Sequence, residues 1–138
     1  MFDEFKVEVA QDVFIVGFPR GLAGSGLLPI WKRGSIASEP GVDYGGLPCL
    51  LIDSTTREGL SGSPVIAEFV GYHAKDRDRP SGDDWIGLGR SFLGVYSARL
   101  KGQDEFEAQL GVVWKAETVR DITATGRDRL GSRIGPGG

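Results

Sequence analysis

Glycine constrains this chain more than any other residue type, because it occupies 22 of the 138 positions. That is about 16 %, against a typical usage of about 7 %. Glycine weakens helix interiors and suits tight turns, so this content argues against a helical bundle. The glycines follow no triplet period, which excludes a collagen-like chain. We therefore expect short elements joined by many tight turns.

Six segments carry the β-branched, aromatic and alternating pattern of strands, and turn residues separate them. These segments are residues 12–18, 28–37, 47–53, 63–70, 92–100 and 109–115. Residues 85–88 are a seventh short strand or part of a charged loop that spans residues 72–84. One or two helical turns are expected at residues 117–122. The pattern predicts an all-β barrel or sandwich in residues 1–125, followed by a disordered tail at 126–138.

Charge and cysteine content exclude several function classes. Sixteen basic against nineteen acidic residues give a net charge of −3, which argues against a binder of nucleic acids or of acidic membranes. No apolar run is long enough for a membrane helix. The charged start of the chain is no signal peptide, and Cys49, the single cysteine, forms no internal disulfide. A soluble, cytoplasmic protein is the expectation.

Neither a metal nor any other cofactor is expected. Acidic residues gather in the charged loop, but basic residues alternate with them, and the spacing of a calcium-binding loop is missing. The Gly-Ser-Gly at residues 24–26 is no nucleotide site, because no helix follows it.

The segment that carries chemistry is Gly-Leu-Ser-Gly-Ser-Pro at residues 59–64. Acyl transfer needs a nucleophile on an exposed turn, with backbone N–H groups aimed at the developing oxyanion. Gly59 allows an N–H to turn inward, and Gly62 leaves room for substrate beside Ser61. Taken alone, such a string is more often an ordinary glycine–serine turn.

The wider pattern resembles the trypsin-like serine peptidases of chymotrypsin fold, in particular their cysteine-poor bacterial branch of high-temperature-requirement type. The family's motif G-[DN]-S-G-[GS]-P matches residues 59–64 except at Leu60. Asp53 stands eight residues before Ser61, as in that branch. Residues 16–22 resemble its V-G-N-P-x-G-L turn, and residues 31–38 resemble the strand that follows. The family order continues through residues 93–97, residues 110–113 and the terminal helix.

The resemblance covers about residues 12–122 and implies the second of the family's two barrels. The implied fold is an antiparallel six-stranded Greek-key barrel with a short C-terminal helix. Ser61 is then the nucleophile, and the N–H groups of Gly59 and Ser61 form the oxyanion hole. Thr55 matches the base of the specificity pocket and Gly111 its wall.

Three further residues are implied to contact substrate or the triad. Ala98 and Arg99 match the edge that pairs with substrate, and Ser97 matches a serine that hydrogen-bonds the triad carboxylate. Thr55, Ser97 and Arg99 could each equally be an ordinary polar strand residue. Leu60 replaces an aspartate that receives a freed N-terminus in trypsin-type zymogens, so activation by N-terminal cleavage is not expected.

The missing half of the peptidase decides the functional expectation. In this family the catalytic His and Asp come from the first barrel, and His73, the only histidine, follows the nucleophile strand in the charged loop. We expect the nucleophile-bearing half of a serine endopeptidase, inactive alone, with the His/Asp half upstream or on a separate chain. Its partners would be a peptide or protein substrate, that first barrel, and another copy of the chain. The alternatives are a non-catalytic barrel used for binding or assembly, and an unrelated β-barrel hydrolase that uses Ser61.

Overall fold

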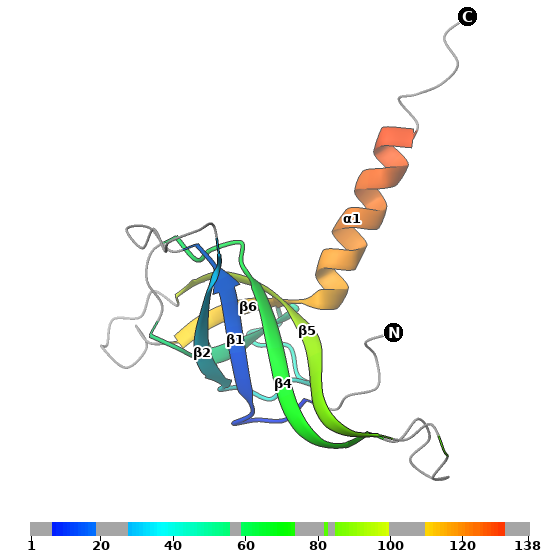
Figure 1. Cartoon of the computed structure of the whole chain (residues 1–138). Coiled ribbons are helices and arrows are strands. Elements are labelled where there is room, and N and C mark those ends of the chain that lie inside the picture. Colours follow the sequence, from blue (N-terminus) through cyan, green and yellow to red (C-terminus); the bar gives the residue numbers. More distant parts are fainter. Residues whose placement is uncertain are drawn as a thin grey trace, which may run out of the picture.

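The computed structural model describes residues 7–18, 28–55, 59–73, 82, 85–99 and 110–131. Within them lie six strands and one helix, drawn in Figure 1. The elements are β1 (Asp12–Gly17), β2 (Ile30–Ile36), β3 (Cys49–Asp53), β4 (Pro64–His73), β5 (Trp85–Arg99), β6 (Leu110–Lys115) and α1 (Ala116–Gly131). All six predicted strands are present, and residues 85–88 belong to β5.

The strands close into a single antiparallel barrel with the spatial order β1-β2-β3-β6-β5-β4. Every neighbouring pair is antiparallel. Strands β4, β5 and β6 are consecutive neighbours, and β3 lies beside β6, which is the Greek-key arrangement. The predicted six-stranded Greek-key barrel is therefore confirmed, and the sandwich alternative is wrong.

The alternation of side chains explains how the barrel core forms. In β1 every second residue is buried, and in β3 four consecutive residues, Cys49 to Ile52, are buried. The core is built from aliphatic side chains of all six strands and from Leu60 before β4, with Tyr96 of β5 as its aromatic member. The fully buried members with the largest volumes are Ile15, Ile36, Ile52, Val13, Val65 and Val113. Burial of this apolar surface drives folding, since the only cysteine forms no disulfide.

Gly94 is required where β5 begins to pair with β6. It has φ +149°, and a Cβ built there would overlap the carbonyl oxygen of Trp114. It also lies opposite a register shift between Val65 and Ile66 in the β4–β5 ladder. Glycine is the residue that tolerates both the backbone angle and the close approach.

Strands β4 and β5 extend well beyond their other barrel neighbours. β1 pairs with β4 only as far as Ala67, and β6 pairs with β5 only from Gly94 onward. The remaining pairs, from Glu68↔Arg90 to His73↔Trp85, form a two-stranded ribbon, which we name the β4–β5 arm. Figure 1 shows the arm leaving the barrel. The prediction of a loop at residues 72–84 was therefore wrong at Tyr72 and His73, and residues 74–81 lie outside the described residues.

The C-terminal helix is longer than predicted. α1 runs from Ala116 to Gly131 and not only over residues 117–122, so residues 126–131 of the expected tail are helical. Residues 132–138 lie outside the described part of the chain. Ala116 is a strong helix former, and Glu117 lies in the first turn, where the helix dipole favours a negative charge. The Thr123 hydroxyl donates to the carbonyl oxygens of Val119 and Arg120 inside the helix. No helix in the described residues is long and apolar enough to cross a membrane.

Candidate active site

Ser61 lies at the outer corner of a tight turn. The N–H of Ser63 donates to the carbonyl oxygen of Leu60 over 3.0 Å, which closes a four-residue turn. Gly62, at the third position, has φ +91°, the left-handed backbone that a type II turn requires there. Ser61 occupies the second position and is exposed. The local sequence therefore presents the hydroxyl-bearing residue to solvent.

The residues on both sides of Ser61 anchor this turn in the barrel. Leu60 is 2 % exposed and belongs to the hydrophobic core. Ser63 is also buried. Both pack against Gly17 at the end of β1, where an added Cβ would overlap the Ser63 Oγ and lie 3.1 Å from the Leu60 Cδ2. The turn is thus held from inside by the side chains of Leu60 and Ser63, which pack closely against Gly17.

Two backbone hydrogen bonds join the turn to β5. The Gly62 N–H donates to the carbonyl oxygen of Tyr96 over 2.7 Å, and the Tyr96 N–H donates to the carbonyl oxygen of Ser63 over 2.9 Å. They continue the β4–β5 ladder past Pro64, where the regular pairing with Val95 ends. Ser61 and Ser97 are consequently the next residues along the two chains.

The two N–H groups assigned to the oxyanion hole have no acceptor among the described residues. No hydrogen bond from the N–H of Gly59 or Ser61 is formed within them. Both residues are exposed, and Gly59 has φ +96°. Glycine adopts this left-handed backbone more readily than other residues, and a special backbone conformation was expected at Gly59. Convergence of the two groups on one point stays a prediction.

The remaining predicted site residues occupy the same end of the barrel. This end is where β1, β3 and β5 finish and where β2, β4 and β6 begin. Thr55 is exposed two residues past β3. Gly111 is buried against Tyr96, whose Cε2 would lie 2.5 Å from an added Cβ.

Strand β5 contains a β-bulge at the residues that are predicted to pair with substrate. The register between β5 and β6 shifts from Tyr96↔Val113 to Arg99↔Gly111, so β5 holds one residue more than β6 there. Ser97 and Ala98 form this bulge, and Ser97 is half-buried. Bulges are common near active sites because they change the direction of a strand edge. The fold therefore gathers Ser61, Gly59, Thr55, Ser97, Ala98, Arg99 and Gly111 at one end of the barrel.

His73 lies far from this end. It is the last residue of β4 and pairs with Trp85 at the tip of the arm. Nine residues separate it from Pro64 along a strand, which corresponds to about 30 Å at roughly 3.3 Å per residue. A general base must lie within hydrogen-bond reach of its nucleophile, so His73 does not serve Ser61 within one chain. Its expected position in a loop was wrong, since it is a strand residue.

A second constellation, which the sequence reasoning missed, covers the outer face of β1, β2, β4 and β5. Nε and Nη2 of Arg33 donate to the two carboxylate oxygens of Asp12 over 3.1 and 2.6 Å. Nε and Nη2 of Arg90 donate to Oε1 of Glu68 over 3.2 and 3.0 Å. Arg90 also stacks on Trp31, with 5.3 Å from its Cζ to the ring centroid. The sequence does carry a signal for this cluster, because its residues occupy alternate, outward-facing positions of their strands.

The two shifted pKa values among the described residues, those of Arg33 and Cys49, do not indicate a catalytic group. The Asp12 carboxylate raises the pKa of Arg33 through a hydrogen bond and its charge. Burial raises the pKa of the Cys49 thiol, so the thiol stays protonated near neutral pH. The described residues hold no group of three His, Cys, Asp or Glu that could bind a metal ion.

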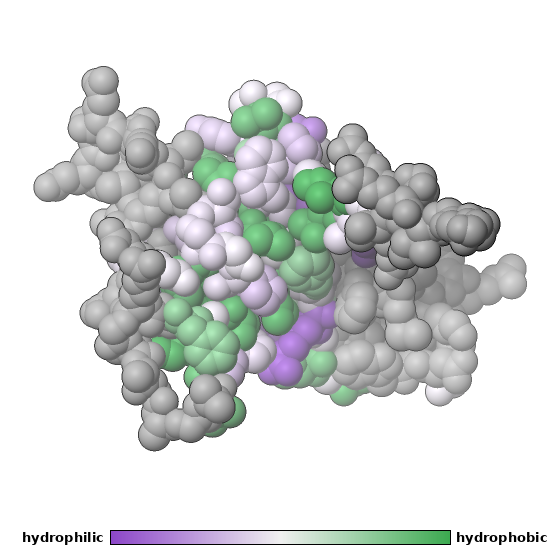
Figure 2. Space-filling view, turned by 90° about the horizontal axis from the view of Figure 1, so that it is seen from above, coloured by the Kyte–Doolittle hydropathy of each residue, from purple (hydrophilic) through white to green (hydrophobic). Residues whose placement is uncertain are grey.

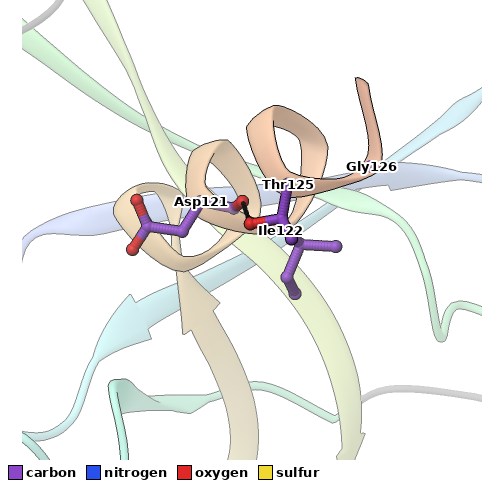
Figure 3. Close-up of a pocket in the computed structure, with 4 residues that line it drawn as sticks. All are labelled: Asp121, Ile122, Thr125 and Gly126. Atoms are coloured by element: carbon purple, nitrogen blue, oxygen red, sulfur yellow. Dashed lines mark hydrogen bonds between the residues drawn. The ribbon is translucent and has the colours of Figure 1, made fainter. Parts of the chain in front are cut away.

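A hollow on α1 has few polar groups in its lining that could take part in a reaction. Asp121, Ile122, Thr125 and Gly126 line it. Figure 3 shows the Asp121 carboxylate pointing away from the Ile122 side chain. The Thr125 hydroxyl donates to the carbonyl oxygen of Asp121 over 2.9 Å, so a backbone bond already engages it. One exposed carboxylate beside one aliphatic side chain makes no catalytic arrangement.

Comparison with known proteins adds no assignment, because no protein-family model matches the chain and neither a curated protein nor a solved structure resembles it significantly.

Proposed function

We propose that this chain is the nucleophile-bearing half of a serine endopeptidase. The observation that carries the proposal is the position of Ser61 on its turn. The residue is exposed, the preceding Leu60 is fixed in the core, and the following Gly62 is bound to β5. A nucleophile needs this combination of access and rigidity, because its oxygen must meet a carbonyl carbon at a fixed angle.

In the proposed reaction the Oγ of Ser61 attacks the carbonyl carbon of a peptide bond. The hydroxyl proton passes to a histidine that the missing half supplies. The N–H groups of Gly59 and Ser61 donate to the resulting oxyanion. The same histidine then protonates the leaving amine, and the acyl group stays on Ser61. Water, deprotonated by that histidine, hydrolyses the ester and restores the serine hydroxyl.

The substrate would lie along the end of β5. The bulge at Ser97 and Ala98, followed by Arg99, offers a strand edge beside Ser61. Thr55, two residues past the end of β3, and Gly111 on β6 would lie at the neighbouring positions. Thr55 carries no charge, so the proposal implies no preference for a basic residue before the cleaved bond.

A partner half would cover this end of the barrel. Two large apolar side chains, Phe18 after β1 and Leu28 before β2, are exposed there. Seen from above, the described surface carries several apolar clusters among paler residues (Figure 2). Contiguous apolar surface usually marks an interaction site. The first barrel of the peptidase, encoded upstream or as a separate chain, is the proposed occupant.

A non-catalytic binding or assembly barrel is the second candidate. It is favoured by the distance of about 30 Å between the start of β4 and His73, because the chain holds no other histidine. The two candidates differ in one respect that can be measured, which is whether Ser61 becomes nucleophilic when the rest of the peptidase is present.

Labelling by a fluorescent fluorophosphonate separates the two. The reading frame upstream of Met1 is first determined, and the extended or co-expressed protein is labelled alongside its Ser61→Ala variant. The proposal expects labelling that is lost in Ser61→Ala and kept in the matched control Ser35→Ala on the barrel wall. If a His- and Asp-bearing barrel is present and Ser61 still does not react, the chain is a binding module.

A further inference from the structure

The β4–β5 arm carries an exposed apolar strip at the end of the barrel opposite Ser61. Val70 is 79 % exposed, Ile86 is 80 % exposed and Leu88 is 47 % exposed. Val70 and Leu88 are directly paired across the two strands. Ile86 lies two residues from Leu88 and so shares its face. The three side chains therefore form one continuous strip on one side of a two-stranded ribbon.

This strip borders a groove on the outer face of the barrel. The groove has a volume of about 450 Å³ and is lined by Asp12, Phe14, Arg33, Glu68, Phe69, Val70 and Leu88. Val70 and Leu88 belong to both the strip and the groove. An apolar projection and a groove thus lie side by side on a single face of the chain.

The charges around the groove are already paired with one another. Arg33 binds both oxygens of Asp12, and Arg90 binds Glu68 while stacking on Trp31. The arm residues 69–72 and 85–89 carry no charged side chain. A strongly acidic or basic partner would therefore find no unpaired charge among these residues. The face therefore suits an occupant that offers apolar side chains and whose own charges are already paired.

We propose that this occupant is a second copy of the chain. In a two-fold dimer the strip of each copy would lie in the groove of the other, because strip and groove occur together on one face. Such an arrangement buries both apolar strips. It also supports an arm that is weak alone, since an isolated two-stranded ribbon is marginally stable in water. The interface is separate from the end that bears Ser61, so it does not depend on the proposed peptidase activity.

Sedimentation equilibrium of the full chain over a wide concentration range tests the dimer. The expected result is a reversible monomer–dimer equilibrium whose dissociation constant changes little between low and high salt, because the ion pairs are internal to each copy. A chain that stays monomeric at all concentrations, or a dimer that salt strongly weakens, would overturn the proposal.

Substitutions locate the interface. Val70→Glu is expected to raise the dimer dissociation constant at least about 30-fold, as expected for a central interface residue. Val42→Glu, at a comparably exposed residue outside the face (60 % exposed), is the matched control and should leave the constant unchanged. If Val70→Glu does not fold, the nearly isosteric Val70→Thr gives the same test, with circular dichroism and cooperative unfolding as the check on folding.

A third substitution distinguishes the two faces. Phe18→Glu alters the end that bears Ser61 and should leave this dimer intact. If Phe18→Glu dissociates the dimer and Val70→Glu does not, the copies meet through the candidate active-site end and the proposal is wrong. Fluorophosphonate labelling of Ser61 is independent of all these outcomes, so either idea can fail without the other.

Discussion

At the scale of single residues, the turn that bears Ser61 depends on a neighbour whose side chain is hidden. Leu60 is buried and contacts the core, whereas Ser61 is exposed one residue later. Under the proposed function, Leu60 stands where a trypsin-type zymogen has an aspartate that becomes paired only after cleavage. An apolar anchor needs no such step, because burial drives it into place on folding.

Leu60→Ala should therefore lower the free energy of unfolding by about 2–5 kcal/mol, since it removes buried methyl groups and leaves a cavity. Ser61→Ala, on the exposed side of the same turn, should change it by no more than about 0.5 kcal/mol. Urea denaturation followed by tryptophan fluorescence measures both. Equal effects of the two substitutions would show that Leu60 does not anchor the turn.

Cys49 gives a prediction about pH. Burial raises the pKa of its thiol in the folded state, so the folded chain holds this proton more tightly than the unfolded chain. The contribution to stability is complete below the unfolded pKa of about 8.5. It is lost as the pH rises through the higher folded pKa, because the unfolded chain ionises first. The stability difference between the native chain and Cys49→Ala should shrink as the pH rises above about 8.5. A difference independent of pH in urea titrations would contradict this.

At the scale of elements, the start of the pairing between β5 and β6 depends on a backbone conformation that only glycine readily adopts. Gly94 combines φ +149° with an approach to the carbonyl of Trp114 that leaves no room for a side chain. It also directly precedes the stretch of β5 that contacts the turn of Ser61. Gly94 therefore affects the geometry of the barrel end that bears Ser61.

Gly94→Ala should destabilise the chain by at least about 2 kcal/mol, because it adds backbone strain and an overlap with the neighbouring strand. Gly71→Ala is the matched control in the β4–β5 arm, where an added Cβ meets nothing within 4 Å. It should be neutral or stabilise by about 0.5 kcal/mol through the unfolded state. Thermal unfolding of both variants measures the difference. Similar losses of stability in Gly94→Ala and Gly71→Ala would show that Gly94 has no special role in the fold.

At the scale of the whole molecule, the barrel brings Ser61, the end of β5 and Gly111 to one end, and none of the described residues at that end is a histidine. His73 is at the tip of the arm. An unassisted serine hydroxyl is a weak nucleophile. Loss of triad members costs on the order of a million-fold in turnover.

The purified 138-residue chain should accordingly show no turnover of casein or of peptide libraries above background. Adding the His- and Asp-bearing half should produce cleavage that depends on Ser61. Release of labelled peptides, followed with the native chain and with Ser61→Ala, measures this. Robust cleavage by the chain alone that Ser61→Ala abolishes would contradict it, and loss of that cleavage in His73→Ala would identify His73 as a base acting between copies.

The sequence by itself determined the presence and order of the six strands and the left-handed glycines of the turn that bears Ser61. Local pattern suffices for these, because side chains that alternate between buried and exposed positions specify a strand. In the same way Gly59 and Gly62 specify left-handed backbone on both sides of Ser61. Closure into a barrel and not a sandwich was anticipated only through the family resemblance.

Only the tertiary structure decided the β4–β5 arm, the length of α1 and the outer-face groove. Tyr72 and His73 belong to a stretch that reads locally as a charged loop, and they become strand because the β4–β5 ladder continues through Tyr72↔Ile86 and His73↔Trp85. Helix α1 contains threonine, valine and glycine, which are weak helix formers. The groove joins outward residues of four strands, such as Phe14 and Leu88, which lie 74 positions apart in the chain. Such distant residues meet only because the barrel closes. The local sequence pattern does not predict which distant strands pair with one another.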